Sequence, residues 1–173
     1  MRNLFTYSIF ALTCFLLNCT NDTEKISITP TISIDFPKAH TIIENYKETA
    51  GTSYEAKAGE DKLSIFSYPF YSLQSFSFNE KKESMETNVL GYISTLRGKR
   101  LSYSEEVIGE TLLSNFSFEF EENDSLYTMY GNYIVEDFNI IIISIKTLNP
   151  ISQNSKKTRD RFLNSLRIKS DSN

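Results

Sequence analysis

Regular alternation of apolar and polar residues in the second half of the chain restricts the fold more than any other feature. In the segment 116–121, three phenylalanines alternate with Ser117, Glu119 and Glu121. Successive side chains of a β-strand point to opposite faces, so this pattern predicts a strand with one buried face. Further strands are predicted around it, at 101–108, 126–135 and 138–148. Because the connections between these segments are short, we expect an antiparallel meander.

The last of these strands contains four consecutive isoleucines, at 140–143. A strand that is apolar on both faces is typical of the centre of a sheet that helices cover on each side. Shorter strands are predicted earlier in the chain, at 32–36, 41–47, 52–57 and 62–68. The first of them is stopped by Pro37, which cannot donate a backbone hydrogen bond to a neighbouring strand.

Two helices are predicted from apolar residues spaced about one turn apart. The helix at 80–96 has one apolar stripe, formed by Met85, Val89, Tyr92, Ile93 and Leu96. A second helix is predicted at 156–168, with Phe162, Leu163 and Leu166 on its apolar side. The order of elements indicates an α+β domain with an antiparallel sheet.

The N-terminus has the pattern of a secretory signal peptide. Arg2 is followed by an apolar run at 4–17, and the residues at 21–25 are polar or charged. The run is shorter than the roughly 20 apolar residues that a membrane-spanning helix needs. The alternative is an N-terminal core helix of a cytosolic protein, but this does not explain why a polar segment begins so soon after the run.

The residues Leu16-Leu17-Asn18-Cys19 end this segment, and they resemble the lipobox of bacterial lipoproteins. The resemblance implies that Cys19 is lipidated and that residues 1–18 are removed as a lipoprotein signal peptide. It also implies a location in the bacterial cell envelope, with the membrane as a partner through the lipid anchor. Thr20 does not resemble the aspartate retention signal of some enteric bacteria, so the outer membrane is preferred.

The rest of the chain has the length and composition of one domain. The 173 residues include 18 basic and 22 acidic side chains, and the net charge of −4 argues against a nucleic-acid partner. We predict a polar tether at 19–31, the folded domain at 32–169 and a tail at 170–173. Cys14 lies in the removed segment, so the mature domain is expected to contain no disulfide.

The order of elements in this domain resembles the PsbP-like fold. The matching features are Ile34-Asp35-Phe36-Pro37, the helix at 80–96, the paired long strands and Phe162-Leu163-Asn164-Ser165-Leu166. The resemblance covers nearly all of 32–168 and implies an antiparallel sheet sandwiched between helices. No ligand or partner is carried over from it.

The sequence contains little that is typical of catalysis. His40 is the one histidine, and it follows a predicted strand in a polar segment. It could act as a general base, but the sequence has neither the G-x-S-x-G turn of a hydrolase nor a glycine-rich nucleotide-binding motif. We therefore predict a solvated loop histidine, no enzyme activity and no cofactor.

Two charged clusters have both a functional and a simpler interpretation. The acidic cluster surrounds a predicted turn and consists of Glu119, Glu121, Glu122 and Asp124. Its spacing does not match a calcium loop, so a solvated hairpin without a metal is favoured. The basic cluster consists of Lys156, Lys157, Arg159 and Arg161. It could contact anionic lipid headgroups, although such clusters are more often the solvated face of a helix.

An aromatic connector precedes the first helix and is the candidate binding surface. Its candidate residues for a ligand or partner are Tyr68, Phe70, Tyr71, Phe76 and Phe78. Aromatic side chains are enriched at interfaces and in ligand pockets. The simpler interpretation is that these rings pack down onto the sheet.

These features predict a lipid-anchored, non-catalytic envelope protein that binds or scaffolds a partner, either an envelope protein or a small apolar ligand. The alternative function is a carrier or chaperone-like module that binds an apolar ligand or peptide at the connector, 68–79. A hydrolase that uses His40 is the least favoured hypothesis.

Overall fold

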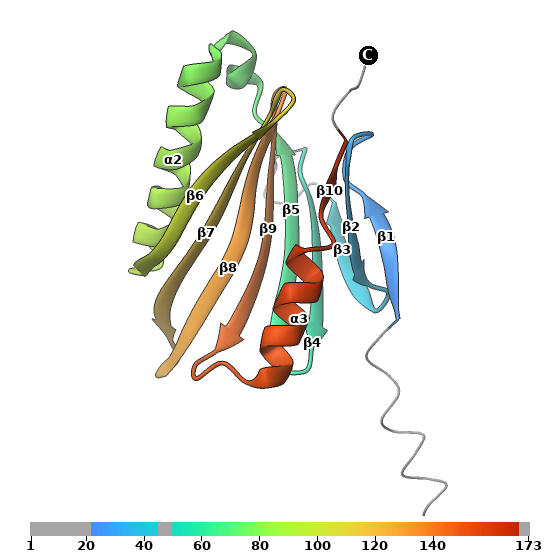
Figure 1. The fold of residues 1–173 in the computed structure, drawn as a ribbon, viewed down its shortest axis with the longest axis vertical. Coiled ribbons are helices and arrows are strands. Elements are labelled where there is room, and N and C mark those ends of the chain that lie inside the picture. The colour runs from blue at the N-terminus through green and yellow to red at the C-terminus, as the bar shows by residue number, and fades with distance from the viewer. Residues whose placement is uncertain (1–21, 45–49, 170–173) are drawn as a thin grey trace, which may run out of the picture.

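The computed structural model describes residues 22–44 and 50–169, and most of these residues belong to one large antiparallel sheet. The bounds of its strands are β3 His40–Glu44, β4 Thr52–Ala58, β5 Asp61–Pro69, β6 Lys99–Ile108, β7 Thr111–Glu122, β8 Ser125–Glu136 and β9 Asn139–Leu148. They lie in the order β3-β4-β5-β9-β8-β7-β6 (Figure 1). The last four strands form the predicted meander, and Asn123 and Asp124 make the β7–β8 turn in the left-handed conformation.

A small sheet of three strands packs beside the large one. β1 (Thr23–Ser27) and β10 (Arg167–Ile168) both pair with β2 (Ile32–Pro37) in antiparallel register. Ile26 lies opposite Ile34, and both side chains are buried. The last described strand thus pairs with β2, which lies between it and β1 (Figure 1).

Different elements cover the two faces of the large sheet. α2 (Phe78–Thr95) lies over β7 and β8, and its apolar stripe packs onto the phenylalanines of β7. α3 (Gln153–Leu163) and the small sheet cover the opposite face, where Phe162 joins the core. Ile141 of β9 belongs to this second core, whereas Ile140 belongs to the core beneath α2.

The start of α2 is specified by its own sequence. The Ser77 hydroxyl accepts a hydrogen bond from the Glu80 amide, and the Glu80 carboxylate accepts one from the Ser77 amide. Hydrogen bonds from the Ser77 hydroxyl and amide lower the pKa of Glu80. After the helix, Gly98 passes so close to β7 that an added Cβ atom would lie 2.6 Å from the Phe118 ring.

The α+β class, the meander and the helix predicted at 80–96 are confirmed, but two predictions at the ends of the domain are wrong. Residues 23–27, predicted as tether, form β1, the edge strand of the small sheet. Ile26 of this strand is buried in the core that the small sheet shares with the large one. The helix predicted at 156–168 begins at Gln153 and ends at Leu163, after which the chain extends to pair with β2. The predicted strand at 41–47 includes residues 45–47, which lie outside the described residues.

The prediction that helices cover the central strand on both sides is correct for only part of β9. α2 packs on β7 and β8, towards the β6 edge of the sheet. As a result, Ile142 and Lys146 of β9 line a groove on the same face of the sheet.

Candidate functional site

Three exposed aromatic residues and one partly buried ring lie at one end of the large sheet, and we name these four residues the aromatic tip. It consists of Phe70, Tyr71, Phe78 and Phe138. Tyr71 is 64% exposed, and its ring stacks on Phe138 with the ring centres 5.4 Å apart. Phe78 and Phe70 are 47% and 38% exposed. This is a large amount of aromatic surface in contact with water.

The aromatic tip is held in place by backbone bonds and by one buried leucine. The Phe70 amide donates to the Phe138 carbonyl at 2.7 Å, which ties the connector to the β8–β9 turn. Lys81 Nζ of α2 donates to the Asp137 carbonyl of the same turn at 3.0 Å. Beneath the tip, Leu73 of the 3-10 helix η2 (Tyr71–Ser75) is 1% exposed. The connector is therefore a packed structural element.

The structure separates the five predicted binding residues into two groups. Phe70, Tyr71 and Phe78 are exposed, whereas Tyr68 and Phe76 are partly buried against the core beneath α2. Burial raises the pKa of Tyr68. The sequence did not point to Phe138, the fourth member of the tip, because it lies in the β8–β9 turn, far along the chain from the connector.

The aromatic tip lies at the opposite end of the domain from the start of β1 (Figure 1). Strand register places His40 level with Ile145 of β9, and the tip lies beside Asn139 at the other end of that strand. Thr23 pairs with Pro37, three residues before His40, so the start of β1 lies near the level of His40. Six strand residues at about 3.3 Å each separate the two levels by about 20 Å.

A groove beside α2 was not predicted from the sequence. Its volume is about 440 Å³, which is within the usual range for small-molecule sites. The apolar part of its lining consists of Phe66, Tyr92, Leu96, Phe120, Met129 and Ile142. These residues come from one helix and four strands, so no local sequence pattern could reveal that they share a surface.

Six polar side chains of the groove are paired with one another. Lys146 Nζ lies 2.5 Å from a Glu122 oxygen, and Lys62 Nζ lies 3.0 Å from a Glu55 oxygen. Ser64 and Ser144 share a hydrogen bond of 2.9 Å across β5 and β9. The groove therefore combines an apolar lining with paired charges and hydroxyls.

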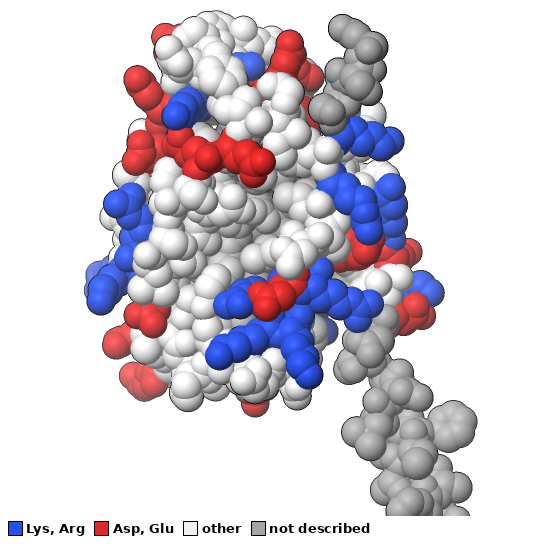
Figure 2. All heavy atoms as spheres, viewed as in Figure 1, with Lys and Arg blue, Asp and Glu red and all other residues white. Residues whose placement is uncertain are grey.

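The four basic residues predicted near the last helix lie on or beside the exposed side of α3. Figure 2 shows a blue cluster over α3, the helix that contains these four residues. Arg159 pairs with Asp160 at 2.7 Å, and its guanidinium lies 4.6 Å from the centre of the Tyr130 ring. Lys157 and Arg161 line a shallow cavity of about 190 Å³.

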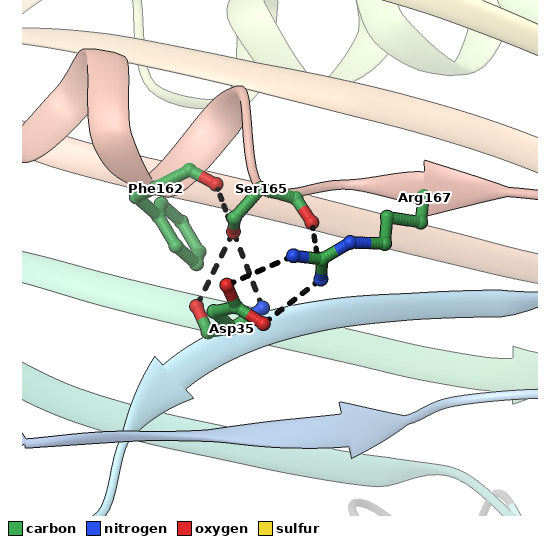
Figure 3. Close-up of polar contacts among 4 residues, drawn as sticks. All are labelled: Asp35, Phe162, Ser165 and Arg167. Atoms are coloured by element: carbon green, nitrogen blue, oxygen red, sulfur yellow. Dashed lines mark hydrogen bonds and ion pairs between the residues drawn. The ribbon is translucent and has the colours of Figure 1, made fainter.

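Arg167 and Asp35 join the end of the domain to β2 (Figure 3). The guanidinium donates to both carboxylate oxygens, at 2.9 and 3.2 Å. This hydrogen bond lowers the pKa of Asp35 and raises that of Arg167. The Ser165 hydroxyl accepts from the Asp35 amide at 3.2 Å and donates to the Phe162 carbonyl at 2.7 Å. These bonds explain why the predicted helix ends early.

His40 is not the solvated loop residue that the sequence predicts. It begins β3, and its side chain is 9% exposed because it packs against the Phe36 and Tyr54 rings. Its Nδ1 lies 2.7 Å from the Pro37 carbonyl oxygen and 3.5 Å from a Glu24 oxygen. In this position the histidine connects β3 to the small sheet.

The acidic residues near the β7–β8 turn do not converge. Glu122 pairs with Lys146, and Glu119 accepts a hydrogen bond of 3.1 Å from the Asn149 side chain. Among the described residues, no group of three or more His, Cys, Asp or Glu side chains could hold a metal ion.

Comparison with known proteins shows the fold. No protein-family model and no curated protein sequence matches the chain. The chain is similar in structure to cyanobacterial PsbP (CyanoP) from Synechocystis sp. PCC 6803, with a TM-score of 0.62 and 8% identity. The match covers 85% of this chain and 92% of that one. The fold predicted from the sequence, an α+β domain of PsbP-like type, is therefore confirmed.

Two further solved structures match with lower scores. A protein from Bacteroides thetaiotaomicron has a TM-score of 0.49 and 13% identity, and the match covers 86% of this chain and 49% of that one. LpqN, involved in cell envelope biogenesis of Mycobacterium tuberculosis, has a TM-score of 0.45 and 10% identity, with 85% and 90% covered.

The predicted signal peptide, the lipobox and Cys19 lie outside the described residues, as does the tail at 170–173. Within the part that the structure describes, no helix is long and apolar enough to cross a membrane.

Proposed function

We propose that this protein is a non-catalytic lipoprotein of the bacterial cell envelope, anchored through lipidated Cys19 in the outer membrane, and that it binds an envelope protein through the aromatic tip. The observation that carries the proposal is the exposure of Phe70, Tyr71 and Phe78 on a packed support, at the end of the domain opposite the start of β1.

Exposed aromatic side chains on a rigid support are suited to partner binding. Tyrosine and phenylalanine bury a large area for little loss of conformational freedom, and they are enriched in the centres of interfaces. Tyr71 is already stacked on Phe138, and the connector is fixed above Leu73. Binding therefore requires little further ordering of the tip.

The predicted anchor fixes which end of the domain lies near the membrane. Three residues separate Cys19 from Thr23, and a chain of this length spans at most about 14 Å. An anchor at Cys19 therefore keeps the start of β1 near the bilayer. The aromatic tip, at the other end of the domain, then faces away from the membrane and is accessible to a partner.

Replacing Tyr71 and Phe78 together by serine is expected to reduce partner binding at least tenfold without unfolding the domain. Both side chains are exposed, so their loss removes contact area but little core packing. The measurement is crosslinking in intact envelopes followed by purification of the tagged chain. A double variant with Leu101→Ser and Val107→Ser, at two exposed residues of β6, is the matched control.

A partner that crosslinks equally well to both double variants would show that the aromatic tip is not the binding surface. Repeated crosslinking of the wild-type chain without any captured protein would contradict partner binding itself.

A second candidate function is that of a carrier for a small apolar ligand, and the groove beside α2 supports it. This location differs from the connector, where Leu73 fills the space beneath the rings.

We expect Ile142→Glu to weaken binding of a fluorescent fatty acid at least tenfold, because it introduces a charge among apolar residues of the groove. Val107→Glu, on exposed β6, is the control. Equal binding by both variants would exclude the groove as the site.

A further inference from the structure

The charge of this chain is unevenly distributed, and the basic residues collect at its C-terminal end. Residues 153–169 contain six lysine and arginine side chains and one aspartate, although acidic residues outnumber basic ones in the whole chain, 22 to 18. An asymmetry of this kind indicates an anionic partner. Within this segment, α3 and the residues that follow it expose Lys156, Lys157, Arg161, Arg167 and Lys169 to solvent.

We propose that the exposed side of α3 docks on an anionic membrane surface. We name this side the α3 basic face and define it by Lys156, Lys157, Arg159 and Arg161 (Figure 2). The inference rests on the proposed function, because it states how the anchored domain lies against its own membrane.

The charges of the α3 basic face are only partly neutralised within the domain. Asp160 pairs with Arg159, and Asp35 is held by Arg167. Lys156 and Lys157 form no ion pair with any residue in 22–44 or 50–169. Both lysines are exposed, so they are free to approach lipid phosphates.

The position of the α3 basic face relative to the start of β1 favours a membrane over other anionic partners. Thr23, near the first described residue, lines the same shallow cavity as Lys157 and Arg161. The short segment between Cys19 and Thr23 thus keeps these two cations close to the bilayer of an anchored chain. At such distances an anionic surface attracts lysine and arginine, and the attraction falls off within a Debye length, about 8 Å at physiological salt.

The same face contains little that could enter the hydrocarbon. Its outward residues are charged or polar, and the two apolar residues of α3 pack on the core, Phe162 buried and Leu163 partly buried. Docking is therefore electrostatic, and it should weaken strongly as salt is raised. It leaves the aromatic tip at the far end of the domain free for a partner.

The test measures vesicle binding by the chain that starts at residue 20. This chain retains both cores and every strand of the described structure, and a cooperative thermal transition checks its folding. Binding is measured by sedimentation with phosphatidylcholine vesicles that contain or lack phosphatidylglycerol, at low and high salt. The test variant is Lys157→Gln/Arg161→Gln, in the α3 basic face. Its matched control is Lys99→Gln/Arg100→Gln, which also removes one lysine and one arginine, but from exposed positions of β6.

We expect binding only to vesicles with phosphatidylglycerol, lost at high salt and reduced about tenfold in the α3 variant but not in the β6 variant. Equal loss in both variants, or no binding by the wild-type chain, would overturn the proposal. Binding to polyglutamate without binding to vesicles would also overturn it and would indicate an acidic protein partner. Because this chain carries no lipid, the result is independent of whether Cys19 is modified.

Discussion

Replacing Cys19 by alanine is expected to abolish both the lipidation of the chain and the cleavage of its signal peptide. The wild-type protein purified from membranes should have the mass of residues 19–173 plus that of its acyl chains, and the variant should lack the acyl mass altogether. One acyl chain binds a membrane only marginally, whereas several chains give stable anchoring, at about 0.8 kcal/mol for each buried CH2 group. The anchor is therefore expected to decide where this protein resides.

Cys14→Ala is the matched control for this experiment. It changes the other cysteine of the chain, which lies within the predicted signal peptide and is absent from the mature protein. Its mature mass should equal that of the wild type. A wild-type protein that retains residues 1–18, or that carries no lipid, would refute both the anchor and the membrane-facing orientation built on it.

The antiparallel meander could be predicted because its signals are local. The alternation of Phe116, Phe118 and Phe120 with polar residues reports one buried face directly. Short turns then leave only one pairing for each strand with its neighbour in the sequence. The central position of β9 also followed from the sequence, since four isoleucines in a row are typical of a central strand that is apolar on both faces.

The small sheet could not be predicted because its pairing is not local. β10 has only two residues, and it pairs with β2 more than a hundred residues earlier. In β1, Ile26 is the one buried side chain, so no alternating pattern distinguishes this strand from a tether. His40 was misinterpreted for the same reason, since the rings that bury it belong to β2 and β4.

The candidate site was predicted in part. The composition of the connector identified it as an aromatic surface, but it could not tell which rings face water. That division depends on Leu73, which fills the space beneath η2, and on the β8–β9 turn, which supplies Phe138. The groove exists because α2 covers only part of the sheet. The position of the helix on the sheet is set by tertiary packing, which no local sequence pattern reports.

Phe118→Ala is expected to lower the free energy of unfolding by about 3–5 kcal/mol, because it leaves a cavity in the core beneath α2. Phe118 is fully buried, and its ring contacts those of Tyr92, Phe116 and Phe120 at 5.6–6.1 Å between ring centres. Domains of this size are stable by about 5–15 kcal/mol, so the loss is a large fraction of the total.

Urea unfolding followed by circular dichroism measures the effect of Phe118→Ala, and Phe78→Ala provides the comparison. Phe78 is half-exposed in the aromatic tip, so its loss should cost less than about 1 kcal/mol. The two variants thus separate stability from binding: Phe118 supports the sheet that carries the tip, and Phe78 belongs to the surface that we propose binds the partner. Similar losses of stability in both would mean that the tip is part of the core, and that its exposed rings are not free to bind.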